Sequence, residues 1–412
     1  MKFSNRYLIA GALLLPSLFS IPVSALPLTL PQALVLAEQY SPVLKVAGAQ
    51  AANADAALDT ARAFPNPEVE FGTGNSLLLP AQRGHNSAVT IAQPVEFPGL
   101  RNSRRQAAEA GVMSSVAQRD EARINLYAQV KQAFFEVLRR QDEAQQANEN
   151  HVLLLQIRNR VKLRVEVGES PRYEQVKSDA EALTAENAAR SAEIRVAQAK
   201  DRLRALLGAP LGDDFEITHS IKEVANIPAL AQLRSELLAS QPVLKIADAE
   251  TRRAEAKLEL ERSLRIPQPT LKWSAERHPD VSLWRVSVAM PLPLWDQRKG
   301  QVGEAYANRE RAVADQDRIR FALLGELDQA YGRYQIARHQ MTVFETGLMR
   351  EAEAALKVAE AAYRYGERGI LDYLDAQRVF RSTRMDYLNA RYELQFALID
   401  IERLRATAGE NK

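Results

Sequence analysis

Apolar residues along much of this chain follow the spacing of helices that pair lengthwise. In the C-terminal part they step by seven, four and three residues, at Tyr387, Leu394, Leu398 and Ile401. The intervening surface is polar, so each helix has a narrow apolar seam that a neighbouring helix must cover. Residues 100–167 contain no proline and one glycine. This stretch therefore predicts one continuous helix of about 100 Å.

Further stretches bounded by proline and glycine also predict helices. They cover residues 30–62, with a break at Ser41-Pro42, and residues 172–207, 229–264, 300–365 and 370–406. An ordinary helical bundle is the alternative reading, but helices of this length are rare in compact domains.

Two short strand pairs interrupt the helices. The first is predicted at Glu68–Phe71 and Ala88–Ala92, joined by a loop containing Gly84 and Asn86, and the second at 270–276 and 281–290. Polar and apolar residues alternate in these strands, so each strand has one polar and one apolar face.

The polar face should carry Glu68, Glu70, Lys272 and Glu276. A polar face backed by an apolar one suits water on the inside and lipid on the outside, although a soluble sheet is the alternative. Four strands cannot close a barrel, which needs about eight. Several chains are therefore expected to share one barrel, with these four residues facing its lumen.

The whole pattern occurs twice. Residues 41–49 (SPVLKVAGA) return as residues 241–249 (QPVLKIADA). Downstream, Val89–Pro94 parallels Val286–Pro291, and Val167–Glu169 parallels Tyr365–Glu367. A period this long indicates that one structural unit is built twice.

The first 25 residues have the features of a signal peptide. Lys2 and Arg6 accompany an apolar stretch, and Val23-Ser24-Ala25 forms a small-residue cleavage site. An uncleaved anchor is the alternative. We expect a signal peptide at 1–25, a first repeat at 26–218 with its strand pair at 67–95, and a second repeat at 219–412 with its strand pair at 269–291. The chain has no cysteine, so no lipid anchor on a cysteine is expected.

Charge and motifs argue against two broad classes of function. The formal net charge is only +2, whereas a nucleic-acid-binding surface shows a basic excess, so no nucleic-acid partner is expected. No metalloprotease, phosphate-loop or nucleophile motif is present, and the histidines are scattered. We expect no enzyme activity, no cofactor and no metal site. His85 and His278 are placed in the loops between strands without an assigned role, with metal capture there as a minor alternative.

The duplication, the order of elements and the glycine turns resemble the TolC-like outer-membrane factor family over essentially the whole mature length. Residues 363–377 (YRYGERGILDYLDAQ) are very similar to that family's second helical tip. Residues 64–68 (FPNPE) and 93–101 (QPVEFPGLR) are similar to the branch that serves cobalt–zinc–cadmium and copper efflux pumps. The resemblance implies a mainly α fold with a small β part, built as a long coiled-coil α-helical barrel in the periplasm. Four strands per chain would contribute to a trimeric, twelve-stranded transmembrane β-barrel in the outer membrane of a Gram-negative bacterium.

The function implied by this resemblance is that of a passive exit duct for efflux. The homotrimer would contact outer-membrane lipid and work with a periplasmic adaptor (membrane fusion) protein and an inner-membrane pump of the resistance–nodulation–division type. Heavy-metal cations are the implied substrates; organic compounds, or type I secretion through the same fold, are alternatives. A periplasmic coiled-coil adaptor is an alternative from another class, but it would have one helical hairpin where this chain has two.

The resemblance also implies sites at the far end of the helices. Matched residue by residue, the tip motif and its repeat place a periplasmic gate at Glu174, Tyr363, Arg368, Asp372 and Asp375. In a trimer the acidic members would form rings that attract cations. The opposing interpretation is that acidic residues near a helix start are favoured by the helix dipole alone. The expected adaptor-contacting tips are Gly168, Glu169, Gly366 and Glu367.

Overall fold

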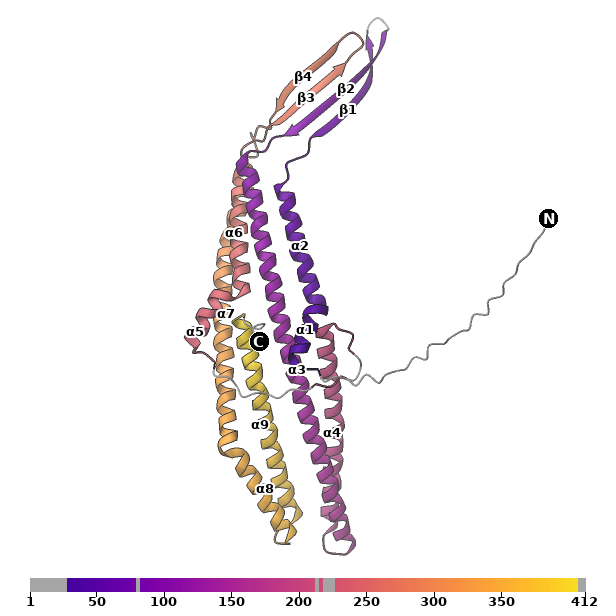
Figure 1. The fold of residues 1–412 in the computed structure, drawn as a ribbon, viewed down its shortest axis with the longest axis vertical. Coiled ribbons are helices and arrows are strands. Elements are labelled where there is room, and N and C mark those ends of the chain that lie inside the picture. The colour runs from indigo at the N-terminus through magenta and orange to yellow at the C-terminus, as the bar shows by residue number, and fades with distance from the viewer. Residues whose placement is uncertain (1–27, 79–81, 212–214, 218–226, 407–412) are drawn as a thin grey trace, which may run out of the picture.

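The structure is a computed structural model that describes residues 28–78, 82–211, 215–217 and 227–406. The predicted signal peptide, residues 1–25, lies outside the described residues. Figure 1 shows an elongated molecule in which a small sheet stands at one end of long, roughly parallel helices.

Both halves of the chain contain the same succession of helices and strands. The first half contains α1 (Leu30–Tyr40), α2 (Pro42–Arg62), β1 (Glu68–Leu78), β2 (Gln82–Pro94), α3 (Pro98–Glu166) and α4 (Arg172–Leu207). The second half contains α5 (Leu230–Ser240), α6 (Pro242–Ser263), β3 (Thr270–Arg277), β4 (Ser282–Ala289), α7 (Lys299–Val343), the π-helix η1 (Phe344–Leu348), α8 (Met349–Arg364) and α9 (Ile370–Leu404).

The helix predictions are confirmed except at two places. The single helix predicted over residues 229–264 is wrong: Pro242 starts a new helix, so this stretch forms α5 and α6 with a break at Gln241. α3 has 69 residues, about 100 Å at 1.5 Å per residue. α2 and α6 both begin at a proline, because the first helical turn needs no N–H donor there. The predicted single helix over residues 300–365 is wrong: η1 interrupts it. A π-turn accommodates one more residue than an α-turn, and a hydrophobic pattern alone does not reveal this extra residue.

The four strands form one antiparallel sheet in the order β1-β2-β3-β4, so the strand pairs of the two halves meet at β2 and β3. One row across the sheet is Glu68, Ala92, Lys272 and Ser287, and the next is Val69, Ile91, Trp273 and Val286. Residues directly opposite one another point to the same side of a sheet. The sheet therefore has one polar face and one apolar face, as the alternation predicts.

The first strand pair is longer than predicted, and the expected loop through Gly84 and Asn86 is wrong. Both residues lie in β2, opposite Ser76 and Gly74. His85 therefore lies in a strand and not in a loop, whereas His278 lies between β3 and β4 as expected. A Cβ atom at Gly84 would lie only 2.0 Å from Pro279 Cγ. Glycine at this position thus allows the turn between β3 and β4 to approach β2 closely and does not mark a turn of its own.

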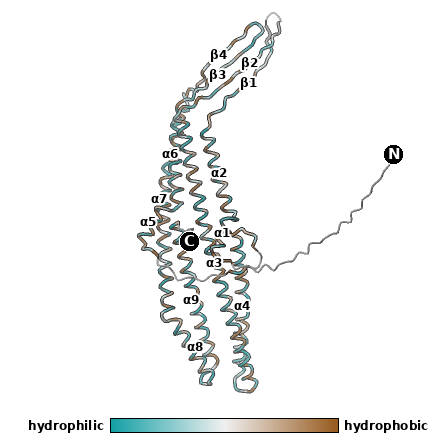
Figure 2. Tube along the Cα trace, in the orientation of Figure 1, coloured by the Kyte–Doolittle hydropathy of each residue, from teal (hydrophilic) through white to brown (hydrophobic). Residues whose placement is uncertain are grey.

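Polar and apolar residues are interleaved along the helices, as Figure 2 shows. Among the described residues, no helix is both long enough and apolar enough to cross a membrane. The buried side chains gather in three clusters between helices. One surrounds Phe134 and Leu203 midway along the molecule, one surrounds Leu327 between α5, α7 and α9, and one surrounds Ile157 and Tyr373 near the hairpin ends.

The helices lie side by side in one layer, and the helices that make up this layer change along the length of the molecule. Near the sheet the order is α2, α3, α6 and α7, which matches the order of the strands they connect to; farther away it is α4, α3, α9 and α8. This order leaves α2 and α7, and then α4 and α8, at the outer sides of the helical layer.

Candidate functional site

The two helical hairpins end in the same turn, at the end of the molecule opposite the sheet (Figure 1). Gly168 and Gly366 have φ values of +80° and +75°. The next residue in each turn closes it with a backbone hydrogen bond. The N–H of Glu169 donates to the carbonyl oxygen of Arg164 at 2.8 Å, and the N–H of Glu367 donates to that of Ala362 at 2.9 Å. A left-handed glycine with this hydrogen bond is a Schellman motif, which ends a helix sharply. All four predicted adaptor-contacting residues are therefore exposed at these two ends.

The predicted gate residues of the last helix lie on one exposed surface at its start. Arg368 and Asp372 form an ion pair at 3.4 Å, with 68% and 54% of their side chains exposed. Asp375 lies 3.8 Å from Arg378, which also reaches Glu181 of α4 at 3.0 Å. The second hairpin is thus tied to the first by an ion pair that sequence reasoning did not identify.

Tyr363 is held by two partners that the sequence pattern did not predict. Its ring stacks on that of Tyr373, with centroids 5.8 Å apart and planes within 4°. The guanidinium of Arg164 lies 5.5 Å from the centre of the Tyr363 ring, which connects the first hairpin to the second through a cation–π contact. Burial is the largest factor that raises the pKa of the Tyr373 phenol, so this ring is neutral at physiological pH.

Glu174 lies next to the start of the last helix. Its Oε1 atom is 3.9 Å from the position that a Cβ atom would take at Gly369. The structure therefore brings the acidic residue of the first repeat to the turn of the second repeat, where Arg368 and Asp372 lie. Carboxylate rings would require further copies of the chain.

The predicted lumen residues share the polar face of the sheet. Glu68 and Lys272 belong to one row, Glu70 lies opposite Thr90 in the next polar row, and Glu276 lies opposite Ala88 in the following one. The reverse face is apolar and exposed, with Phe71 at 78%, Trp284 at 75% and Val286 at 63%. Exposing apolar surface to water costs about 25 cal/mol for each Å². An exposed apolar face of this kind therefore indicates that the sheet lies against an apolar environment.

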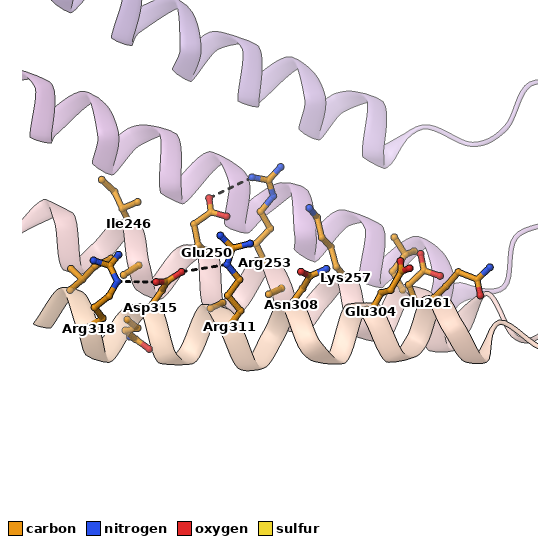
Figure 3. Close-up of a pocket in the computed structure, with 18 residues that line it drawn as sticks. Ile246, Glu250, Arg253, Lys257, Glu261, Glu304, Asn308, Arg311, Asp315 and Arg318 are labelled. Carbon is orange, nitrogen blue, oxygen red and sulfur yellow. Dashed lines mark hydrogen bonds and ion pairs between the residues drawn. The ribbon is translucent and has the colours of Figure 1, made fainter.

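A polar groove of about 800 Å³ runs between α6 and α7, and Figure 3 shows that its charged side chains point toward one another. Asp315 lies 3.0 Å from Arg318 and 3.8 Å from Arg311, and Glu250 lies 3.5 Å from Arg253. Alternating charges that neutralise each other are typical of a solvated helix surface. Among the described residues there is also no group of three or more histidine, cysteine, aspartate or glutamate side chains placed to hold a metal ion.

Comparison with known proteins defines the class of this protein. The family model of the outer membrane efflux protein matches residues 33–209 and again residues 233–407. The chain therefore belongs to the outer membrane efflux protein family. This family is a passive channel fold of the outer membrane and not an enzyme, which confirms the predicted class, fold and location.

Individual relatives are similar to the chain over most of its length. The cobalt-zinc-cadmium resistance protein CzcC of Cupriavidus metallidurans is 26% identical over 381 residues, which is 92% of this chain and 90% of CzcC. The nickel-cobalt-cadmium resistance protein NccC of Alcaligenes xylosoxydans xylosoxydans is 25% identical over 340 residues, 77% of this chain and 73% of NccC. The CmeC outer membrane channel of Campylobacter jejuni superposes with a TM-score of 0.81 at 16% identity, over 92% of this chain and 86% of CmeC.

Proposed function

We propose that this protein is the outer membrane exit duct of a three-part efflux system and that it acts as a homotrimer. The sheet carries this proposal: β1 and β4 are its edge strands, and its apolar face is exposed. Open edges pair with further strands. Three copies would supply twelve strands, enough to close a barrel with the polar face inside. A periplasmic adaptor and an inner-membrane pump of the resistance–nodulation–division type would complete the system.

Two structural repeats, at 26–218 and 219–412, would each supply one strand pair and one hairpin to this duct. Glu68, Glu70, Lys272 and Glu276 would line the lumen of the barrel. The turns around Gly168 and Gly366 would contact the adaptor because they are the exposed ends of the long hairpins.

Heavy-metal cations are the proposed substrates. The support is the names of CzcC and NccC, which describe resistance to cobalt, zinc, cadmium and nickel. Deleting this chain from its host should increase sensitivity to these metals and leave sensitivity to organic toxicants unchanged. The reverse pattern would make this an exit duct for organic compounds. If neither sensitivity changed while purified protein still formed pores, the assignment to metal efflux would fail.

The gate is proposed to consist of Glu174, Tyr363, Arg368, Asp372 and Asp375. Arg368 and Asp372 are already paired within one chain, and three copies would crowd the carboxylates at the narrow end. Asp372→Ala combined with Asp375→Ala should raise single-channel conductance in planar bilayers and weaken cation preference. Glu353→Ala is a suitable control, because this exposed carboxylate lies on α8 away from the tip. Unchanged conductance and selectivity would discard the gate assignment.

A further inference from the structure

The apolar face of the sheet ends short of the turn between β3 and β4. Four exposed residues in alternating positions carry this face along β4 and just beyond it: Trp284, Val286, Val288 and Met290. At 3.4 Å per residue, they cover about 20 Å along the strand. The exposed segment 292–295 (LPLW) lengthens the apolar stretch toward the helices. Together they are long enough for the apolar band of about 25 Å that outer-membrane barrels present to lipid.

The next row on the same face consists of groups that can donate hydrogen bonds. The register places four residues directly opposite one another from β1 to β4, and they form the donor row: Thr73, Ser87, Arg277 and Ser282. All four are exposed. The neighbouring row toward the helices is entirely apolar and consists of Phe71, Val89, Ala275 and Trp284. The face therefore changes from apolar to polar within about 7 Å along the strands.

The guanidinium group of Arg277 has no ion-pair partner in the described part of the chain. The carboxylate next to it in sequence, that of Glu276, belongs to the polar face, where it lies 3.4 Å from His278 Nε2. Asp280 follows in the turn between the strands and not in the sheet. Arg277 thus presents an exposed positive charge at the border of the apolar face, and the donor row contains no acidic side chain to neutralise it.

The row beyond the donor row is polar as well. Asn75 and His85 lie opposite one another in β1 and β2. The imidazole of His85 lies with Nδ1 3.4 Å from Asn75 Oδ1 and with Nε2 3.3 Å from Thr73 Oγ1. These contacts hold the imidazole on the same face as Arg277. Neither of these two described rows contains a carboxylate, so the surface suits an anion.

The depth of the donor row in a membrane indicates which anion it meets. The row lies near the end of the sheet that is farthest from the helices (Figure 1). An arginine that faces lipid is unfavourable at the bilayer midplane and is tolerated near the interface, where the headgroups begin. Trp284, in the adjacent row and 75% exposed, agrees with this depth because tryptophan is enriched at membrane interfaces. Phosphate groups of lipids lie there, and a guanidinium binds them through paired, charge-assisted hydrogen bonds.

We propose that the donor row binds phosphate groups of lipid headgroups in the outer leaflet of the outer membrane. Arg277 would hold a phosphate group, and the hydroxyl groups of Ser87 and Ser282, on either side of it, would donate to the remaining oxygens. The acyl chains of the same lipid would lie along the apolar rows. This inference rests on the proposed function, because the sheet must cross the outer membrane with its β3–β4 turn at the cell surface.

Lipid binding to the detergent-purified, full-length protein tests this surface. Native mass spectrometry measures binding of diphosphoryl lipid A and of the same lipid after removal of its phosphates, with inorganic phosphate as a competitor. We expect the phosphorylated lipid to bind about tenfold more tightly than the dephosphorylated one, because each charge-assisted bond to phosphate is lost with the group. Inorganic phosphate at the lipid's concentration should not displace it. Displacement would show that the row takes free phosphate and would overturn the lipid assignment.

A pair of variants places the binding on one face of the sheet. Arg277→Gln should weaken binding of diphosphoryl lipid A about tenfold. Arg285→Gln is the matched control: this exposed arginine of β4 lies opposite Ser274 on the polar face, so its loss should leave lipid binding unchanged. Equal weakening by both variants would overturn the proposed site.

The comparison of the two lipids on the unmodified protein does not depend on any variant folding. Equal affinity for the two lipids, or no detectable binding of either, would overturn the headgroup site and leave the channel function intact. Failure of the unmodified protein to form pores in planar bilayers would instead overturn the proposed function, and the position of Arg277 at the headgroups with it.

Discussion

A buried ion pair between the two halves of the chain offers a sharp test of how the long helices are held together. Lys131 of α3 is 3% exposed, and its Nζ atom donates to Glu402 Oε2 of α9 at 2.7 Å. The Glu402 side chain is 31% exposed. The ammonium group of Lys131 is thus shielded from water, whereas the carboxylate of Glu402 is partly hydrated. Substituting the two members of the pair should therefore change the free energy of unfolding by different amounts.

Glu402→Gln leaves the ammonium group of Lys131 buried without a counter-charge. Removing one partner of a buried pair typically costs 3–5 kcal/mol, and partial exposure of the carboxylate lowers this to about 2–4 kcal/mol. Lys131→Met keeps the length of the side chain and removes the buried charge, while Glu402 can turn toward water. We expect it to cost about 1 kcal/mol or less. The double variant should resemble Lys131→Met.

Thermal unfolding of the purified protein, followed by helical circular dichroism at one fixed scan rate, measures these differences. For 412 residues, a change of 1 kcal/mol corresponds to about 1 °C in Tm. Glu402→Gln should therefore lower Tm by about 2–4 °C, and Lys131→Met by about 1 °C or less. If Lys131→Met is as destabilising as Glu402→Gln, packing of the lysine stem and not its unpaired charge is responsible, and the reasoning is refuted.

Two further predictions concern backbone conformation and pH. Gly168→Ala and Gly366→Ala should each destabilise the protein by about 1–2 kcal/mol, because their φ values are positive although a Cβ atom would meet nothing within 4 Å. Gly332→Ala, in α7 and equally open, should stabilise it by about 0.5–1 kcal/mol; equal effects at all three positions in denaturant titrations would contradict the conformational explanation. Burial is the main cause of the raised pKa of the Asp400 carboxyl, so the native state binds its proton more tightly than the unfolded state does. The free energy of unfolding should fall as pH rises through and above the ordinary range of an aspartate, and Asp400→Asn should remove this part of the slope. Parallel Tm-against-pH curves for the two proteins would show that Asp400 makes no such contribution.

Local patterns were sufficient for most of the elements. The absence of proline over residues 100–167 predicts α3, and the break at Ser41-Pro42 predicts the start of α2. Alternation in the strands separates Glu68 from Val69, and the observed register keeps them on opposite faces. These features depend on neighbouring residues and on helical or strand periodicity, which is why they can be recognised without a structure.

Local patterns failed where a residue's role depends on a distant segment. Gly84 is predicted to lie in a loop between strands, but it lies within β2, where Pro279, nearly 200 residues away, leaves room only for a glycine. The gate assignment remains a prediction. Tyr363, Arg368 and Asp372 lie at one hairpin tip, whereas Arg164, Glu181 and Tyr373 are neighbours of the predicted gate residues that no spacing in the sequence indicates.

By itself, the sequence determined that two similar units each supply a strand pair and a long helical hairpin, because repetition, helix-breaking residues and alternation are properties of the linear chain. Only the tertiary structure decided how the units meet: β2 against β3, Lys131 against Glu402, and a π-turn in one hairpin alone. These outcomes depend on contacts between residues far apart in the chain. Such contacts are set by packing and by matching charges across helices, and no local pattern specifies them.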